Sequence, residues 1–330
     1  MWLLVEIRLF SVSKPEWAGF KRQYGEAGLP GWRSIEWINC YGIKKQFYFF
    51  LMPGLILFTV VLFIPICQSV YYSFCEYKGL TAPEFIGLKN YKDLLKDKSM
   101  VFALKNSLFF LVFSCVTQLI MGLFLAALLT NIKKGRNLFK NIIYLPCVLS
   151  SAALGLLWMF IFSPKLGINQ ALESFGIEGP LWLMDTSGFI ILPMWVIAFV
   201  ALWQYVGQSM MLYMAQISGI STSLYEASYI DGCSRAKSFI HITLPLIKPM
   251  VATAMSLNAI GSLKFFDLIF NMTEGGPNHR TEVLATHLYT QGFKYNKYGY
   301  ASAIGVVLIV LCLLVTGLIN KFFKSENYEM

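Results

Sequence analysis

The sequence predicts an all-α integral membrane protein with six transmembrane helices. The chain has 330 residues, of which 56% are hydrophobic and only 14% are charged, whereas a soluble domain of this length needs far more polar surface. Six stretches reach the ~20 mainly apolar residues of a membrane-spanning helix, and all exceed the ~9–11 residues of a barrel strand. Backbone groups inside lipid must bond to one another, so these stretches are expected to be helical. The predicted spans are residues 47–71, 102–129, 142–162, 189–213, 246–270 and 301–320.

The spans define one predicted transmembrane domain, residues 47–324, with a shorter segment on each side. Residues 1–46 are polar and carry four tryptophans, so this extension either lies at the membrane interface or forms a poorly ordered tail. Its apolar start is interrupted by Glu6 and Arg8 too early for a secretory signal. Residues 325–330 form a short tail at the other terminus.

The distribution of lysine and arginine predicts the orientation. With both termini in the cytoplasm, sixteen of the 27 basic residues fall in cytoplasmic segments and nine in outside segments, while Lys105 and Lys264 lie at or within spans. Basic residues concentrate on the cytoplasmic side of membrane proteins. The compact loop NIKKGRNLFKN, residues 131–141, is the clearest example. We therefore expect a multi-pass protein of a cell membrane, with both termini and the loop 221–249 in the cytoplasm.

Several other classes of function lack the residues they need. The formal net charge of +9 is not gathered on one basic, aromatic face, which argues against nucleic-acid binding. The seven cysteines include no C-x-x-C pair and the three histidines no H-E-x-x-H motif, so neither a disulfide nor a metal site is expected. The chain has no G-x-x-x-x-G-K-[ST] phosphate loop and no obvious catalytic cluster. We therefore expect no catalytic residues and no ATP hydrolysis by this chain alone.

A small polar segment interrupts the apolar pattern between the fourth and fifth spans. It reads EASYIDGCSRAKSFIHITLPLIKP, from Glu226 to Pro249. Ser223 and Glu226 fit a capping box that begins a short helix. Gly232 is expected to end that helix, because glycine enters the left-handed region without penalty.

A second short helix is expected over about residues 234–242, since apolar positions there recur at helical spacing. Pro245 either ends it or begins the next span, and Pro249 is expected in the first turn of that span. The product is a helix–turn–helix exposed to the cytoplasm, which we call the knuckle (residues 226–249). It is either a docking device for a soluble partner or an ordinary amphipathic connector. The apolar positions are Ala236, Phe239, Ile240 and Thr243.

The order of residues in the knuckle distinguishes these two interpretations. E-A-x-x-x-D-G, followed by F-x-x-I-x-L-P and a further proline, closely resembles the EAA loop of binding-protein-dependent ABC importer permeases. Ser228 stands where alanine is usual. FIGLKNYKDLL, ALKNSLFF, LWQYVGQSMMLYMAQI and FFDLIFNMTEGGP resemble sugar-importer permeases of the maltose and glycerol-3-phosphate type. Over residues 47–324 the chain resembles the larger maltose permease without its periplasmic insertion.

The resemblance implies a type I ABC importer fold, in which this loop inserts as a coupling helix into a cleft on an ATPase. It also implies four partners: a second permease subunit in a heterodimer, two ATPase subunits that bind ATP and Mg, and an extracellular solute-binding protein. The cargo would be a carbohydrate, most simply an oligosaccharide, and this chain would hold no cofactor itself. The expected coupling residues are Glu226, Ala227, Gly232, Phe239 and Pro245.

Polar and aromatic side chains within the fourth and fifth spans are candidates for the substrate path. Aromatic faces with amide and hydroxyl groups bind sugars, but the same groups also form hydrogen bonds between membrane helices. Lys264 and Asp267 are spaced i, i+3, so they either pair on one helix face or face a cavity. The candidates are Trp203, Gln204, Tyr205, Gln208, Asn258, Lys264 and Asp267.

Alternatives remain open at this stage. The loop TEGGPNHRTE, residues 273–282, either contacts the binding protein or only turns the chain. An ABC permease for glycerol-3-phosphate or another non-sugar solute is the nearest alternative, because the knuckle alone would allow it. An ion-coupled secondary carrier would need intramembrane carboxylates and usually an internal repeat, whereas only Asp267 lies deep and no repeat is evident.

Overall fold

The computed structural model describes residues 40–132 and 134–323, with side chains from residue 48 onward. The chain divides after Ile64 into two units, which we describe separately. The described part of the first unit consists of helix α2 (Cys40–Phe58), the π-helical turn η3 (Thr59–Phe63) and Ile64. The helical stretch Tyr48–Ser73 is long and apolar enough to cross a membrane. The tryptophans of the predicted N-terminal extension lie outside the described residues.

The second unit opens with the end of α3 (Ile64–Ser73) and a short hairpin. Strand β1 (Cys75–Glu76) pairs antiparallel with β2 (Glu84–Phe85). The Asn90 amide, at the start of helix α4 (Lys89–Lys96), donates hydrogen bonds to the carbonyl oxygens of Ser73 and Cys75, each at 2.9 Å. The hairpin is therefore held against α4.

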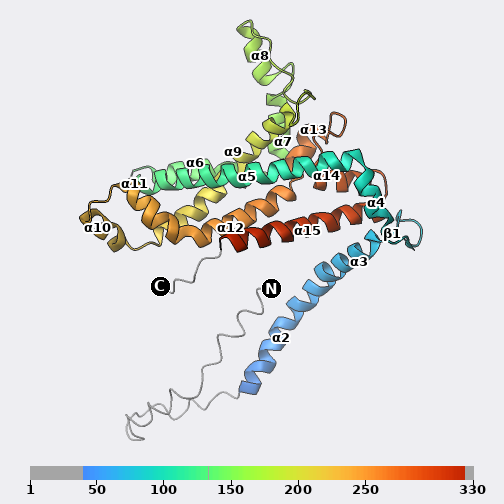
Figure 1. Cartoon of the computed structure of the whole chain (residues 1–330), viewed down its shortest axis with the longest axis horizontal. Coiled ribbons are helices and arrows are strands. Elements are labelled where there is room, and N and C mark those ends of the chain that lie inside the picture. Colours follow the sequence, from blue (N-terminus) through green and yellow to red (C-terminus); the bar gives the residue numbers. More distant parts are fainter. Residues whose placement is uncertain (1–39, 133, 324–330) are drawn as a thin grey trace. The chain divides into compact units, whose positions relative to one another are not determined.

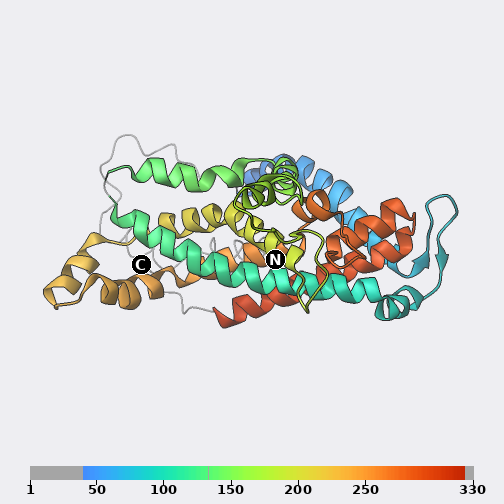
Figure 2. The same cartoon turned by 90° about the horizontal axis from the view of Figure 1, so that it is seen from above.

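Long helices form the body of the second unit (Figures 1 and 2). α5 (Lys98–Asn131) has 34 residues, so it is about 51 Å long and exceeds the ~30 Å hydrocarbon thickness of a bilayer. It packs along α9 (Leu192–Ser218) and α12 (Leu244–Leu263), and α12 packs against α15 (Tyr298–Phe322). The fold is all-α, as predicted, apart from the two-stranded hairpin.

The third predicted span is not one continuous helix. α6 (Arg136–Val148) and α7 (Ser151–Ile161) are bent by 93° at a short break, so a span over residues 142–162 would be a broken one. Pro146 has no N–H to continue the helical ladder, and Leu149 adopts an extended conformation (φ −74°, ψ 149°) directly afterwards. The chain thus turns sharply inside a run that satisfies the length rule for a single span.

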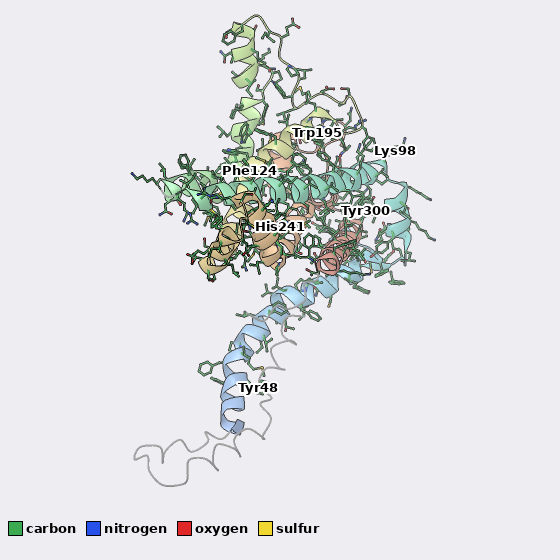
Figure 3. The ribbon with its side chains drawn as sticks, turned by 60° about the vertical axis from the view of Figure 1, so that its left-hand side comes forward. Tyr48, Lys98, Phe124, Trp195, His241 and Tyr300 are labelled. Carbon is green, nitrogen blue, oxygen red and sulfur yellow. The ribbon has the colours of Figure 1, made fainter. Side chains whose placement is uncertain are left out.

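The fifth predicted span is also interrupted. α12 ends at Leu263, and a separate helix α13 (Asp267–Thr273) follows after three residues. The remaining helical elements are α8 (Gly167–Ser174), α10 (Thr222–Ile230), α11 (Arg235–Ser238), η4 (Phe239–Thr243), α14 (Leu284–Tyr289) and η5 (Thr290–Lys294). α10 and α11 lie at one end of the second unit, the knuckle end, and β1, α4 and α14 lie at the other, the β1 end (Figure 1). Lys98 and Tyr300 lie together toward the β1 end, whereas Phe124 and His241 lie toward the knuckle end (Figure 3).

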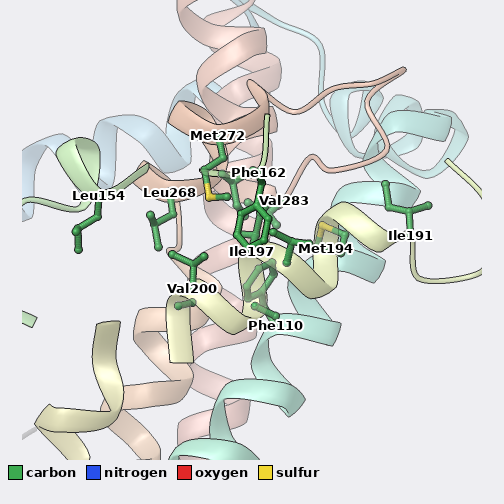
Figure 4. Close-up of a cluster of buried hydrophobic side chains, with 14 residues drawn as sticks. Phe110, Leu154, Phe162, Ile191, Met194, Ile197, Val200, Leu268, Met272 and Val283 are labelled. Carbon is green, nitrogen blue, oxygen red and sulfur yellow. The ribbon is translucent and has the colours of Figure 1, made fainter. Parts of the chain in front are cut away.

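Buried side chains hold the helices together, and the two largest groups of them in the described chain both include residues of α9. The first joins α5, α7, α9 and α13, with Phe110, Met194, Ile197 and Leu268 at its centre (Figure 4). The second lies nearer the knuckle and contains Met210, Tyr213, Met214, Ile247 and Val251. Many large apolar side chains elsewhere stay exposed, as expected of a protein whose outer surface contacts lipid.

Small residues allow these helices to approach closely. At Gly207 of α9, an added Cβ would lie 2.5 Å from the Ile143 carbonyl oxygen and 2.8 Å from the Tyr144 Cα, both backbone atoms of α6. Membrane helices lack a hydrophobic driving force for association, so such close backbone contact contributes much of their packing energy. Gly207 thereby sets the distance between α6 and α9.

Candidate functional site

A cavity of about 230 Å³ lies between α5, α9 and α12, beside the middle turns of α5 and α9, and we call it the central cavity. Three helices of different sequence position contribute to it, and its lining mixes aromatic, amide and hydroxyl groups. The lining residues are Phe110, Ser114 and Gln118 of α5, Ala201, Tyr205 and Gln208 of α9, and Leu257, Asn258, Gly261, Ser262 and Phe265 of α12 and the turn after it.

A chain of hydrogen bonds orders the amides on one side of the cavity. Asn258 Nδ2 donates to Ser209 Oγ at 3.1 Å, and Ser209 Oγ donates to Gln118 Oε1 at 3.3 Å. These two hydrogen bonds tie α5, α9 and α12 to one another. The remaining amide atoms of Asn258 and Gln118 stay available for a ligand, because each amide has two donors and an acceptor with two lone pairs.

Three of the predicted path residues, Tyr205, Gln208 and Asn258, are brought together at this cavity. The Tyr205 hydroxyl hydrogen-bonds to Ser151 Oγ at 3.0 Å, which orients the ring. Trp203 and Gln204 do not line the cavity. Trp203 packs edge-on against Trp158, with ring centroids 5.4 Å apart. Gln204 is buried and donates to the same Ser151 Oγ at 2.9 Å, so its observed contact is between helices.

The expected pairing of Lys264 with Asp267 is wrong. Lys264 is the C-cap of α12 and Asp267 opens α13, so the two residues do not share one helix face. Both side chains are exposed and no ion pair joins them. The i, i+3 rule holds only within a continuous helix, and the chain breaks between these two residues. Asp267 instead lies in the first turn of α13, where the helix dipole stabilises a carboxylate.

The α5 side of the cavity was missed by reasoning from the sequence. Gln118, Ser114 and Phe110 lie on one face of α5 at intervals of four residues. Gln118 carried a usable signal, since a buried amide inside an apolar span needs partners. Phe110 and Ser114 carried none, because such residues occur throughout membrane helices.

The knuckle begins with α10, and its cap differs from the prediction. Ser221 is the N-cap residue, and its side-chain oxygen accepts a hydrogen bond from the Ser223 N–H, so the expected Ser223–Glu226 capping box is wrong. Gly232 ends α10 as predicted. It has φ +76°, its N–H donates to the Tyr229 carbonyl at 3.1 Å, and the next N–H donates to the Ser228 carbonyl at 2.9 Å. These two bonds form a Schellman motif.

The second half of the knuckle continues directly into α12. Ser234 caps α11, and helical structure then runs through η4 to Leu263. Pro245 lies in the first turn of α12, whereas Pro249 lies inside that helix, not in its first turn as expected. The single apolar face expected for residues 236–243 is also wrong, because Ile240 is 55% exposed while Ser238 is buried. The knuckle and α12 therefore form one connected helical body.

Hydroxyl groups join the two arms of the knuckle. Ser228, the departure from the usual alanine, is buried and hydrogen-bonds to Ser238 Oγ at 2.7 Å. The Tyr225 hydroxyl bonds to Thr243 Oγ1 at 2.8 Å. Glu226 and Ala227 are exposed on the other side of α10. The hydroxyl at position 228 thus fastens α10 to α11, and the face carrying Glu226 stays free for a partner.

A buried carboxylate anchors the loop at the β1 end. Glu282 is 1% exposed, and its two oxygens hydrogen-bond to His279 Nδ1 at 2.9 Å and to His287 Nδ1 at 2.7 Å. The Asn106 amide on α5 donates to the Glu282 carbonyl oxygen at 2.8 Å. Nothing in the hydrophobic pattern distinguished Glu282 from a solvated loop residue. The C-terminal part of the loop 273–282 is thus fixed to α5, while contact with a binding protein stays a prediction.

Asp97, the N-cap of α5, lies at the edge of this network. His287 Nε2 is 3.4 Å from Asp97 Oδ2, without hydrogen-bond geometry, and the Tyr300 hydroxyl donates to the same oxygen at 2.8 Å. Burial raises the pKa of Asp97, but the Tyr300 hydroxyl, the Ser99 N–H and His287 together lower it by more, so its pKa lies below the usual value. Asp97 is therefore a stabilised carboxylate that joins α5 to α15.

The sequence matches a family of known proteins. The family described as "Binding-protein-dependent transport system inner membrane component" matches residues 118–325, which include most of the cavity lining and the whole knuckle. The chain belongs to this family. It is a multi-pass membrane protein, and the resemblance to ABC importer permeases seen in its motifs is confirmed.

Two relatives and one solved structure are similar to this chain over most of its length. A probable ABC transporter permease, YurN of Bacillus subtilis (strain 168), is 36% identical over 86% of this chain and 97% of its own length. The multiple sugar-binding transport system permease MsmF of Streptococcus mutans is 32% identical over 84% of this chain and 94% of its own. A chain of a bacterial ABC transporter that imports the acidic polysaccharide alginate is 25% identical, with a TM-score of 0.75 over 86% of this chain and 98% of that one. The similarity therefore extends over nearly the full length of these relatives.

Proposed function

We propose that this chain is the permease subunit of an ATP-driven carbohydrate importer of a prokaryotic cell membrane, and that it forms half of the translocation path. The observation that carries the proposal is the central cavity, where Tyr205 and Phe265 offer ring surfaces beside the amides of Gln118, Gln208 and Asn258. Ring faces and amides together match the apolar faces and hydroxyl edges of a sugar ring. Relatives named for multiple-sugar and alginate transport support the same class of cargo.

In this proposal the knuckle couples the permease to its motor. Glu226 and Ala227 would contact a cleft on a separate ATPase, while Gly232, Phe239 and Pro245 would keep the knuckle rigid. The exposed face of α10 and its direct continuation into α12 support this role. ATP and Mg would be bound by two ATPase subunits, and this chain would only transmit their closure.

The proposed assembly contains a second permease as heterodimer partner and an extracellular binding protein that delivers the cargo. The excess of basic residues in the segments assigned to the cytoplasm, sixteen against nine along the sequence, supports a cytoplasmic position for the knuckle and both termini. The β1 end, with the loop 273–282, would then face the binding protein. Affinity purification from native membranes in mild detergent, followed by mass spectrometry, tests this assembly. Recovery of the intact chain without any ATPase would refute it and favour a secondary carrier.

Uptake measurements test the cavity. Gln208→Ala and Asn258→Ala should each change the relative uptake of a panel of sugars, polyols and glycerol-3-phosphate in cells that express the whole importer. Thr253→Ala is a matched control, because Thr253 is an exposed residue of α12 outside the cavity lining. Unchanged uptake kinetics in both cavity variants would remove the cavity from the path. Uptake restricted to a non-sugar solute would favour the alternative cargo.

A further inference from the structure

A second cavity, of about 380 Å³, lies beside the knuckle, where the ends of α5 and α9 meet α10, α11 and η4. We call it the knuckle groove. Thr222, Tyr225 and Tyr229 of α10 line it, whereas Glu226, Ala227 and Ile230 do not. The groove therefore lies against the residues of α10 that carry these three side chains, and the residues proposed to meet the ATPase are outside its lining.

The knuckle groove is positively charged. Its lining contains two guanidinium groups, those of Arg136 and Arg235, and no acidic side chain. Arg136 donates to Ser218 Oγ at 3.2 Å, which leaves most of its donors free. No ion pair among the described residues includes either arginine. Two cations thus share one cavity without a counter-charge from the protein.

The other groups in the lining match an oxyanion as well. Hydroxyl groups from Ser218, Thr222 and Tyr229 can donate to oxygen, and Ile220 and Phe239 supply an apolar wall. Guanidinium groups bind phosphate with paired, charge-assisted hydrogen bonds. A volume of this size falls within the range of small-molecule sites, roughly 300–1,000 Å³.

We propose that the knuckle groove binds a phosphate group through Arg136 and Arg235, carried either by a soluble phosphomonoester or by an acidic phospholipid. Arg136 begins α6 and Arg235 begins α11, so one bound phosphate bridges the α5–α6 loop to the knuckle. A ligand held there restrains the knuckle relative to the membrane helices. The groove is then a regulatory site, separate from the cargo cavity.

Binding measurements on the intact importer, isolated from its native membranes, test this proposal. The groove variant is Arg136→Gln with Arg235→Gln. The matched control is Lys134→Gln with Lys237→Gln, which removes the same charge from exposed residues two positions away in the sequence that do not line the groove. All three proteins are first checked for retention of the ATPase subunits and a single elution peak.

Two arms distinguish the sources of phosphate. In the first, radiolabelled inorganic phosphate and glucose 6-phosphate are titrated without nucleotide in discs of phosphatidylcholine. In the second, native mass spectrometry counts phosphatidylglycerol retained from mixed discs. We expect the groove variant to lose at least tenfold in affinity or retention in one arm, equivalent to about 1.4 kcal/mol, and the control to stay within about twofold of the wild type.

Three results would overturn the proposal. Equal binding by all three proteins in both arms would show that the arginines hold no phosphate. Equal losses in the groove variant and the control would indicate general surface charge. Loss of the ATPase from the groove variant alone would identify the groove as a protein docking surface.

Discussion

Replacing Gly232 with valine tests whether the shape of the knuckle matters for transport. Gly232 has φ +76°, a conformation that is strained for residues with a Cβ and most of all for β-branched ones. An added Cβ would meet no atom within 4 Å, so steric collision with neighbours contributes nothing. The strain in the left-handed region amounts to about 1–2 kcal/mol. Relaxing the backbone instead would break the two Schellman hydrogen bonds, at about 0.5–1.5 kcal/mol each.

The two routes cost a similar free energy, and relaxation of the backbone also moves the knuckle. A loss of 1–2 kcal/mol corresponds to roughly a 5–30-fold change in an equilibrium. Switching a two-state gate fully takes about 5.5 kcal/mol of differential binding, so this loss is a large part of what coupling requires. We expect Gly232→Val to reduce ATP-dependent uptake at least fivefold, measured in cells with the amount of importer in the membrane determined by immunoblot.

A series at the same position separates backbone strain from side-chain size. Asparagine visits the left-handed region readily, so Gly232→Asn should retain most uptake, Gly232→Ala should be intermediate and Gly232→Val lowest. Gly317→Val is the matched control, because Gly317 lies within α15 with open space around it and no positive φ. Normal uptake by Gly232→Val, or equal loss in the Asn and Val variants, would refute the reasoning.

Further predictions concern stability, measured as thermal unfolding of the purified permease complex. Glu282→Gln should destabilise the β1 end by about 1–3 kcal/mol, because a buried carboxylate with two histidine partners is replaced by an amide; an unchanged midpoint would contradict this. Tyr300→Phe should remove about 1.5–3 kcal/mol at neutral pH. Because the pKa of Asp97 is lowered in the folded protein, its carboxylate stabilises the fold at pH values above the usual carboxyl pKa of ~3.9. This stabilisation is lost as the pH falls through the lowered pKa of Asp97. The difference in unfolding midpoint between Tyr300→Phe and the wild type should therefore disappear in acid. A difference that is constant with pH would be inconsistent with this assignment. Gly207→Ala should cost about 1–3 kcal/mol by forcing α6 from α9, whereas Gly317→Ala should be neutral; equal midpoints would show that the helices can move apart freely.

Local backbone chemistry made part of the knuckle predictable. Gly232 was identified because a polar run with a single glycine has few ways to end a short helix, and the Schellman bonds bear this out. The N-cap was misplaced by two residues because Ser221 and Ser223 are both competent caps. The choice between them depends on how the chain leaves α9, and neighbouring side chains do not encode that.

Breaks inside apolar runs were not predictable by composition. The run over residues 142–162 satisfies the length rule whether it is straight or bent, and the 93° bend follows only from packing around Pro146 and the extended Leu149. The run over residues 246–270 conceals the gap between α12 and α13 in the same way, which is why Lys264 and Asp267 do not pair. Hydropathy reports burial in lipid and carries no information on where a helix stops within it.

The continuity of the knuckle with α12 gives the proposed coupling a direct physical route. Helical structure runs from Arg235 to Leu263 without leaving the helical region, and the same helix supplies Asn258 and Ser262 to the central cavity. A rigid displacement of the knuckle would therefore move one wall of the cavity without an intervening hinge. Two irregularities lie on this route in the described chain, the π-helical turn Phe239–Thr243 and Pro249 inside α12, and π-helical turns are frequent at functional sites. The hydroxyl bond from Tyr225 to Thr243 closes on the π-helical turn, so the arm that carries Glu226 is fastened directly to the helical body that continues to the cavity wall.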